Sequence, residues 1–178
     1  MKYYVADLHF GHSNIIKHDG RPYANVEEMD NDLIKKWNSV VTDNDEVYII
    51  GDFAFRNCKS VKTYADKLNG KKILILGNHD KLSSEDRSCF EKISKMETIT
   101  DKLNGVDVKI VACHFPMAEW EGFFRDTYHI YAHIHNNKNE AYNFMKNFDK
   151  ALNAGCMINN YRPVTLAELI ENNNKFRS

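Results

Sequence analysis

The sequence changes from apolar to polar within eight residues at I-L-I-L-G-N-H-D, residues 73–80. The aliphatic run predicts a short buried strand, and Gly77 releases the chain from strand geometry. The same change recurs at V-Y-I-I-G-D, residues 47–52, and at K-Y-Y-V-A-D-L-H, residues 2–9. Each predicted strand therefore ends in residues that can bind a metal ion or a polar substrate.

Helical patterns separate these strands. Residues 26–40 carry apolar side chains at helical spacing, and Asn25 with Glu28 provides a helix start. Residues 61–68 are expected to form a second helix, which Ser60 caps at its start and Gly70 ends. The resulting order, β-α-β-α-β with short apolar strands, favours a parallel sheet that is covered on both faces.

The second half of the chain is richer in strands. Residues 97–103 and 106–113 flank Asn104-Gly105, which is a strong hairpin signal. Residues 128–132 and 151–154 are further strand candidates, and Thr165 with Glu168 caps a last helix over residues 166–171. Residues 172–178 are expected to form a polar tail. The sequence thus predicts an α/β fold of two packed sheets with helices outside.

Length and composition favour one globular domain, residues 1–178. The 178 residues correspond to about 1.2 domains of ordinary size. The chain is 43% hydrophobic and 28% charged, so it can bury a sizeable core. A net charge of −1 argues against a strongly basic nucleic-acid binder.

Membrane and secreted classes are not favoured either. The longest apolar runs, residues 47–50 and 73–76, are far shorter than the ~20 residues of a membrane span. The N-terminal stretch is interrupted by Asp7 and His9, which a signal peptide would not contain. The four cysteines form no C-x-x-C pair and fit unpaired thiols in a reducing compartment. We therefore expect a cytoplasmic protein without a membrane partner.

Five predicted strand ends carry metal-binding residue types. They end in D-L-H at 7–9, G-D at 51–52, G-N-H-D at 77–80, His114, and H-I-H at 133–135. Ligands in open α/β sheets bind outside the carboxyl ends of the strands. In extended chain, residues i and i+2 point to one face, so each D-x-H or H-x-H pair can aim at one centre. Asp, His and Asn donors without a thiolate suit Mn²⁺, Fe or Zn²⁺.

The order of these motifs resembles the calcineurin-like metallophosphoesterase superfamily. Its pattern is D-x-H, then G-D, then G-N-H-[DE], then a lone H, then G-H-x-H. This chain departs from it only at Ala132, where Gly is usual, and Ala132 is not itself a ligand. The longer string D-L-H-F-G-H-S-N-I-I, residues 7–16, is similar to small bacterial and phage members of the superfamily.

The resemblance implies a four-layer α-β-β-α sandwich of two mixed sheets with two divalent metal ions. Mn²⁺ is the favoured metal, with Fe, Zn²⁺ or Ni²⁺ as alternatives. The implied ligands of the first metal are Asp7, His9, Asp52 and His135. The implied ligands of the second are Asp52, Asn78, His114 and His133, so that Asp52 would bridge the two ions.

The resemblance also implies catalytic roles. His79 would contact the phosphate and protonate the leaving group, and Asp80 would orient its neighbours. Two divalent ions outweigh the two carboxylates of Asp7 and Asp52, which suits a phosphate ester. Hydroxide from a water bridging the metals would attack phosphorus in line, so no Ser or Cys nucleophile is needed.

A second departure concerns the substrate. Phosphoprotein phosphatases extend the second motif to G-D-x-x-D-R, whereas residues 51–56 here are G-D-F-A-F-R. Phe55 replaces the second Asp, which favours phosphodiesters over phosphoproteins. Arg56 remains and is a candidate for binding the phosphate, with Asn78 as a further substrate contact.

Other polar and aromatic residues are open to more than one interpretation. His12 has either a substrate role or a loop-capping role, and Arg21 and Arg125 are candidate phosphate contacts. His18 and His129 are expected to be structural. Trp37 and Trp120 are expected in the core or at its rim, not as platforms for bases.

The favoured function is hydrolysis of a small phosphodiester or cyclic nucleotide. The alternatives on the same site are a phosphomonoesterase and a nuclease, although the net charge disfavours long nucleic acid as a partner. A non-enzymatic scaffold of the same fold is the alternative from another class. Degenerate scaffolds lose metal ligands or the His of G-N-H, and this chain keeps all of them. The sequence leaves the oligomeric state undetermined.

Overall fold

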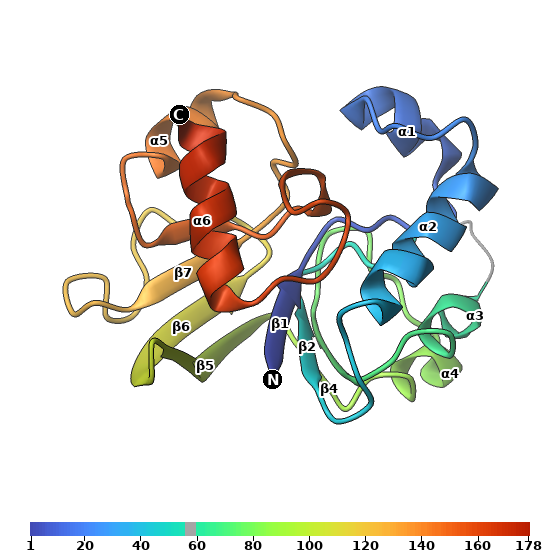
Figure 1. Ribbon diagram of the computed structural model, residues 1–178, viewed down its shortest axis with the longest axis horizontal. Helices are drawn as coiled ribbons and strands as arrows, with labels where there is room; N and C mark the ends of the chain where they lie inside the picture. The colour runs from blue at the N-terminus through green and yellow to red at the C-terminus, as the bar shows by residue number, and fades with distance from the viewer. Residues whose placement is uncertain (56–59) are drawn as a thin grey trace.

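The computed structural model describes residues 1–55 and 60–178, and its first strands form a parallel sheet (Figure 1). The sheet has the order β1-β2-β3-β4, with β1 (Lys2–Val5), β2 (Glu46–Ile49), β3 (Lys71–Ile75) and β4 (Lys92–Ser94). Right-handed crossovers put all the connecting helices of a sheet in chain order on one face. The opposite face therefore stays free for a second sheet.

Two of the helices on that face begin where the sequence predicts capping residues, and a third begins at a cap that was not predicted. In α2 (Val26–Asn38), the Asn25 side chain accepts a hydrogen bond from the Glu28 amide at 2.9 Å. In α3 (Val61–Ala65), Ser60 caps in the same way, and α4 (Ser84–Arg87) has a full capping box. The three helices lie on the same side of the molecule (Figure 1), where buried Leu33 and Trp37 pack toward the sheet.

The second sheet is mixed and has the order β5-β6-β7-β8. Its strands are β5 (Met96–Leu103), β6 (Val106–Cys113), β7 (Tyr128–Tyr131) and β8 (Ala151–Asn153). Strands β5 and β6 pair antiparallel across Asn104 and Gly105, which have φ angles of 52° and 82°, as a tight hairpin turn requires. The pairs β6–β7 and β7–β8 are parallel.

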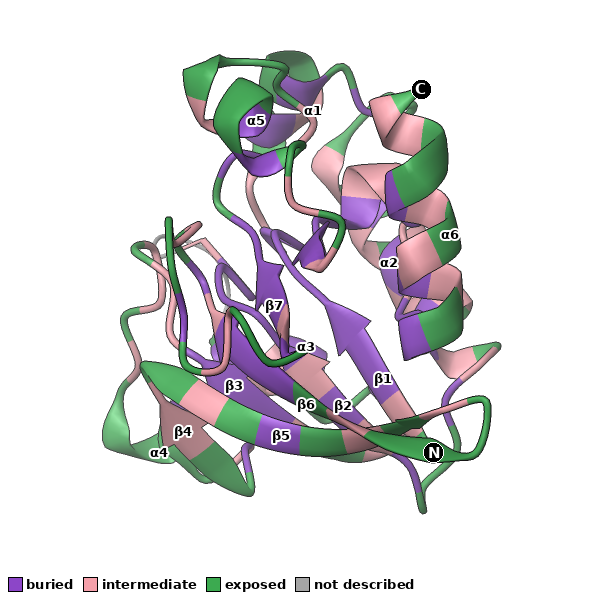
Figure 2. Ribbon diagram, turned by 90° about the vertical axis from the view of Figure 1, so that its left-hand side faces the viewer, coloured by how far each residue is buried: buried purple, intermediate pink, exposed green. Residues whose placement is uncertain are grey.

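The inner faces of the two sheets form a common core. Ile75 from the first sheet and Ile110 and Ile130 from the second are fully buried in one apolar cluster. Helix α6 (Leu166–Arg177) closes this cluster with Leu169, and α5 (Glu140–Met145) covers the outer face of the second sheet. In Figure 2, β1, β3 and β7 are mostly purple, whereas the helices carry much green and β5 is largely exposed. The described residues thus form an α/β fold of two four-stranded sheets that share one core, with helices packed around them.

Some sequence-based expectations differ from the structure. The expectation of two mixed sheets holds for the second sheet, whereas the four strands of the first all run parallel. The expected polar tail at residues 172–178 is wrong, because α6 continues to Arg177 and Asn173 is buried. The sequence analysis did not predict β4, α4, α5, the 3₁₀ turn at Cys156–Ile158, or α1 (Ser13–Asp19). Among the described residues, none of the helices has both the length and the apolar character needed to cross a bilayer.

Candidate metal centre

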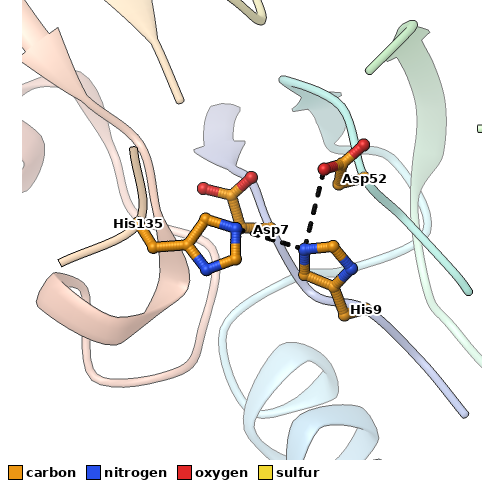
Figure 3. Close-up of side chains that lie close together, drawn as sticks. All are labelled: Asp7, His9, Asp52 and His135. Atoms are coloured by element: carbon orange, nitrogen blue, oxygen red, sulfur yellow. Dashed lines mark hydrogen bonds and ion pairs between the residues drawn. The ribbon is translucent and has the colours of Figure 1, made fainter. Parts of the chain in front are cut away.

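The carboxyl ends of both sheets bring polar side chains to the same edge of the molecule. Asp7 and His9 follow β1, Asp52 follows β2, and His135 follows β7. Their ligand atoms all lie within 4.8 Å of one another, and each side chain is buried. Figure 3 shows the four side chains turned toward a common centre, with both dashed contacts made by His9. The strand-end prediction for this donor set is therefore matched by its placement.

Individual distances show how close the donors come. His9 Nε2 lies 3.3 Å from His135 Nε2 and 3.6 Å from Asp52 Oδ2. Within the described residues, the buried Asp7 Oδ2 and His9 Nδ1 have no hydrogen-bond partner. A buried polar atom without a partner costs about 1–3 kcal/mol, and such groups call for an ion or water. The donor set therefore fits a divalent cation, which the Asp7 carboxylate and the facing Nε2 atoms of His9 and His135 would bind.

Burial also shifts the proton affinities of this set. Loss of hydration raises the pKa of Asp7 to about 6 and lowers the pKa of His9 to about 2. A neutral imidazole carries the lone pair that a metal ion needs, and a bound cation would favour the ionised form of Asp7.

A second donor group adjoins the first through Asp52. Asn78 Oδ1 lies 3.0 Å from His114 Nε2 and 2.9 Å from His133 Nδ1, while Asp52 Oδ2 lies 3.5 Å from His114 Nε2. His114 Nδ1 donates to the Ile50 carbonyl at 2.8 Å, so Nε2 of the neutral ring has a lone pair and no proton. Lone pairs of His114, Asn78 and Asp52 thus converge, an arrangement that a cation stabilises.

The backbone at these donors is unusual. Positive φ angles between 53° and 71° occur at five of the residues, namely Asp7, His9, Asp52, His133 and His135. The expectation that the D-x-H and H-x-H pairs converge because they are extended is therefore wrong. Strand β1 ends at Val5 and β7 at Tyr131, and the donors lie in left-handed turns beyond them.

Two glycines permit the close approach of these turns. Gly51 has a φ of 86°, and a Cβ there would overlap the His114 ring and the backbone of Gly77. A Cβ at Gly77 would overlap Asp52. The G-D motif therefore needs glycine for space and for conformation, and the G-N-H motif needs it for space. Ala132, at the position where the motif usually has Gly, is fully buried in the core between the sheets.

His79 and Asp80 lie beside the donors in different ways. The carboxylate of Asp80 accepts hydrogen bonds from the amides of Gly77, Asp52 and Phe53 at 2.8–2.9 Å, and so ties two strand ends together. Burial raises its pKa, although these amides oppose the shift. The His79 amide donates to Asp52 Oδ1 at 2.9 Å, and its ring centroid lies 5.4 Å from that of His9. Asp80 thus fixes the backbone at Asp52, while the His79 ring lies beside the ring of His9.

A cleft of about 290 Å³ opens over the donors, and α1 contributes one wall. His12 lies in this wall and stacks on Phe55, with 3.9 Å between ring centroids and 6° between ring planes. The lining consists mostly of imidazole and other polar side chains, namely His9, His12, Asn14, Ile15, His18, Asp52, Asn78, His79, His133 and His135. The cleft brings the predicted substrate residues His12 and Asn78 to one surface.

The predicted arginine contacts have different outcomes. Arg21 is buried, and its guanidinium donates to the Asp7 and Leu8 carbonyls and to the Asp19 carboxylate, so the expectation that it binds phosphate is wrong. Arg125 is exposed in the loop that precedes β7. Arg56 lies outside the described residues.

Of the residues expected to be structural, His129, Trp37 and Trp120 are buried in the fold, whereas His18 lies in the lining of the cleft. His129 is fully buried, donates from Nδ1 to the Val111 carbonyl and accepts from the Met117 amide. Trp37 and Trp120 are buried, and each indole donates to a backbone carbonyl. His18 is exposed and contacts Asp19 at 2.9 Å.

The sequence analysis missed Asp19. Its carboxylate lies 2.8 Å from His135 Nδ1, directly behind the first donor set. Burial opposes its ionisation, but hydrogen bonds from His135 and His18 hold the pKa of Asp19 well below its usual range. The string H-D-G-R at 18–21, an acid and an arginine around a glycine, was the available signal.

The fold and this site define a two-sheet α/β protein with a candidate metal centre at the strand ends. No family model matches the chain. It is 36% identical over 171 residues to the uncharacterized protein MJ1445 of Methanocaldococcus jannaschii, covering 95% of this chain and 89% of that protein. The chain therefore belongs to the same family as MJ1445.

Two further similarities concern a phage and a crystal structure. The Gene 66 protein of Mycobacterium phage L5 is 39% identical over 82 residues, which are 44% of this chain and 39% of the phage protein. The crystal structure of the protein of unknown function AQ665 from Aquifex aeolicus superposes with a TM-score of 0.71 at 23% identity, covering 96% of this chain and 98% of that one. This second similarity shows a shared fold.

Proposed function

We propose that the protein is a two-metal phosphoesterase of the calcineurin-like metallophosphoesterase superfamily that hydrolyses a small phosphodiester. The observation that carries the proposal is the convergence of two donor groups on one carboxylate, Asp52. Bound divalent cations would supply Lewis acidity and lower the pKa of a water near phosphorus. Mn²⁺ is the favoured cation, with Fe, Zn²⁺ or Ni²⁺ as alternatives, because the donors are carboxylate, amide and imidazole groups without a thiolate.

In this proposal the chain's own residues have separate tasks. Asp7, His9, Asp52 and His135 hold one cation, and Asp52, Asn78, His114 and His133 hold the other. The His79 ring protonates the leaving oxygen. Asp80 acts through the amides that it fixes, because its carboxylate is already engaged by three of them. His12 and Asn78 line the space beside the phosphate.

The size and polarity of the site support a small ester. A cleft of about 290 Å³ suits a nucleotide-sized group and not an extended polymer. The net charge of −1 also argues against long nucleic acid. Phe55 stacks on His12 at the position where phosphoprotein phosphatases have an acid, which favours a diester over a phosphoprotein.

The test is a comparison of substrates after metal removal and reloading. Protein stripped with a chelator should not hydrolyse bis-p-nitrophenyl phosphate, and Mn²⁺ should restore turnover together with about two metal ions per chain by elemental analysis. A preference for p-nitrophenyl phosphate would favour the monoesterase, and cleavage of a DNA duplex the nuclease. A reloaded protein that binds metal but turns over none of these would contradict an enzymatic function.

The shared carboxylate gives the sharpest single substitution. Asp52→Asn keeps the size of the side chain and a residue that tolerates the left-handed conformation, yet it removes the charge from both donor groups. We expect loss of both metal ions and of nearly all activity. The matched control is Asp45→Asn at the opposite end of β2, a buried carboxylate that accepts from Thr42 and should leave the metals in place. Two metals retained in Asp52→Asn would contradict the shared role.

A further inference from the structure

A buried ion pair lies behind the first donor group. The Asp19 and Arg21 side chains have no exposed surface, and Asp19 Oδ2 lies 2.9 Å from Arg21 Nη2 and 3.1 Å from Nε. The other carboxylate oxygen, Oδ1, lies 2.8 Å from His135 Nδ1. The pair therefore engages a candidate metal ligand on one side and a fixed cation on the other.

The Asp19 carboxylate determines which nitrogen of His135 can bind a metal. A carboxylate paired with a guanidinium accepts hydrogen bonds, so His135 Nδ1 carries the proton. The lone pair then lies on Nε2, which is the atom that faces His9 at 3.3 Å. Without Asp19 the ring would lose both its tautomer preference and its orientation.

Arg21 supports the other side of the same donor group. Its Nη2 donates to the Asp7 carbonyl at 2.8 Å and its Nη1 to the Leu8 carbonyl at 2.9 Å. Asp7 has a φ of 54°, so its carbonyl has turned away from the strand ladder and needs a donor elsewhere. One guanidinium thus joins the turn after β1 to the turn after β7 through Asp19.

Among the described residues, the second donor group has the Asp80 carboxylate behind its backbone but no buried ion pair behind its imidazole rings. The Nδ1 of His114 is held by a backbone carbonyl, that of Ile50, and not by a side chain. His133 Nδ1 faces Asn78, a member of its own group. The two groups therefore differ in how strongly the surrounding protein fixes them.

We propose that Asp19 and Arg21 are positioning residues that make the Asp7–His9–Asp52–His135 group the tighter of two metal sites. The proposal rests on the metal binding of the proposed function, but it concerns affinity and not catalysis. A third cation held by His18, Asp19 and His135 is disfavoured, because Arg21 already neutralises the carboxylate and both imidazole Nδ1 atoms face it.

The experiment is a calorimetric titration of the chelator-stripped full chain with Mn²⁺. The wild type should show a tighter and a weaker binding event. Asp19→Ala should weaken the tighter event by about 10- to 100-fold, the usual effect of losing such a partner, and leave the weaker event within about twofold. Lys17→Ala is the matched control, since it changes an exposed side chain of the same helix that does not line the cleft, and it should change neither event. A tighter event of wild-type affinity in folded Asp19→Ala would overturn the proposal, as would equal losses at both events.

Conservative variants keep the test informative if Asp19→Ala fails to fold. Asp19→Asn retains the volume and one acceptor, so it should fold and weaken the tighter event less than Asp19→Ala does. Arg21→Lys retains the charge but loses the forked geometry and should also affect only the tighter event. If both variants bind like the wild type, the proposal is wrong.

Nuclear magnetic resonance gives a readout that does not need metal. Long-range ¹H–¹⁵N spectra of the stripped wild type should show His135 protonated at Nδ1, and Asp19→Asn should show a mixture of tautomers. Wild-type protein that shows this difference but binds no metal would contradict the proposed function and the difference in metal affinity, and would support only the effect of Asp19 on the His135 tautomer. Metal binding with an unchanged tautomer would contradict the positioning role alone.

Discussion

Asp52 uses its two carboxylate oxygens differently. Oδ1 accepts the His79 amide at 2.9 Å, while Oδ2 faces His9 at 3.6 Å and His114 at 3.5 Å. Because the contact with His79 involves its backbone, the His79 side chain can be changed without loosening Asp52. The role of the ring can therefore be separated from the integrity of the donor groups.

We expect His79→Ala to keep both metal ions and to lose about 10²- to 10⁴-fold in kcat, the usual worth of general acid catalysis. A nitrophenolate leaves readily without a proton and should be affected least, whereas a nucleoside alkoxide should be affected most. The measurement is kcat for both proteins on two diesters that differ in the pKa of their leaving groups. Equal losses on both diesters would indicate that the ring binds phosphate, and loss of metal would indicate that it is a ligand.

His129 makes stability depend on pH away from the metal centre. Burial lowers the pKa of His129 to about 4, whereas an unfolded chain titrates near 6.5. Between these values the unfolded state binds the proton and the native state does not, so stability should be complete above about pH 6.5 and fall as the pH drops toward 4. The gap corresponds to about 3 kcal/mol.

The measurement is urea unfolding of the stripped protein at a series of pH values. His129→Gln should be less stable at neutral pH but should have a flatter dependence between pH 6.5 and 4. The exposed His18→Gln is the control and should keep the wild-type slope. A wild-type slope in His129→Gln would show that other groups cause the acid sensitivity.

At the scale of elements, the C-terminal helix departs furthest from its sequence pattern. The Asn173 side chain accepts from the Asn153 amide at 2.8 Å and donates to the carbonyls of Asn153 and Leu169 at 3.0 and 2.9 Å. Asn153 in turn donates to the His135 carbonyl at 2.8 Å. The last turns of α6 thus supply hydrogen bonds to β8 that the sheet does not provide.

We expect Asn173→Ala to lower the free energy of unfolding by about 2 kcal/mol, because it leaves the buried Asn153 amide without a partner. The control is Asn174→Ala on the exposed side of the same helix, which should be neutral or slightly stabilising, since Ala is the better helix former. Chemical denaturation of both variants measures the difference. Equal stabilities would mean that the asparagine network contributes little.

These elements also show what could be predicted from sequence. The hairpin around Asn104-Gly105 was predicted almost to the residue, because its signal is local. The end of α6 was not, since three consecutive asparagines look like solvent-exposed chain until Asn153 is brought beside them. Helix α1 has His12 at its N-cap position, and the His12 side chain makes no capping hydrogen bond. The sequence therefore contains no signal for the start of this helix.

Some features of the candidate site could likewise be predicted from the sequence, and others could not. The donors of both groups were predicted from their motifs, and the structure brings them together. Their left-handed turns were not predicted, because the residue types Asp and His do not by themselves indicate a left-handed backbone conformation. The burial of Arg21 was also missed, since its carbonyl partners lie 13 and 14 residues away along the chain and approach it only in the folded protein.

On the scale of the whole molecule, the first donor group joins the two sheets. Asp7, His9 and Asp52 follow strands of one sheet and His135 follows a strand of the other, so a cation held by all four would link them. The core between the sheets is apolar and does not depend on such a link. The metal-free chain should therefore fold, with lower stability than the metal-bound chain.

We expect Mn²⁺ at 100 times the dissociation constant of the tighter site to stabilise the chain through that site by about 2.7 kcal/mol, which raises the Tm by about 5–10 °C. Differential scanning calorimetry across a metal series measures this shift, with circular dichroism confirming that the stripped protein is folded. Asp52→Asn is the control and should not respond to Mn²⁺. An equal response in that variant would indicate that metal binds elsewhere.

The left-handed backbone conformation of the five donor residues lowers the stability of the fold. An ordinary side chain in this conformation costs about 1–2 kcal/mol, and Asp7, His9, Asp52, His133 and His135 all adopt it. Glycine would adopt it without strain but would provide no ligand. A random library selected only for resistance to heat in the presence of chelator should therefore accumulate glycine at these positions. Selection for metal-dependent growth or activity would restore Asp and His, so the two selections should drive the same positions in opposite directions.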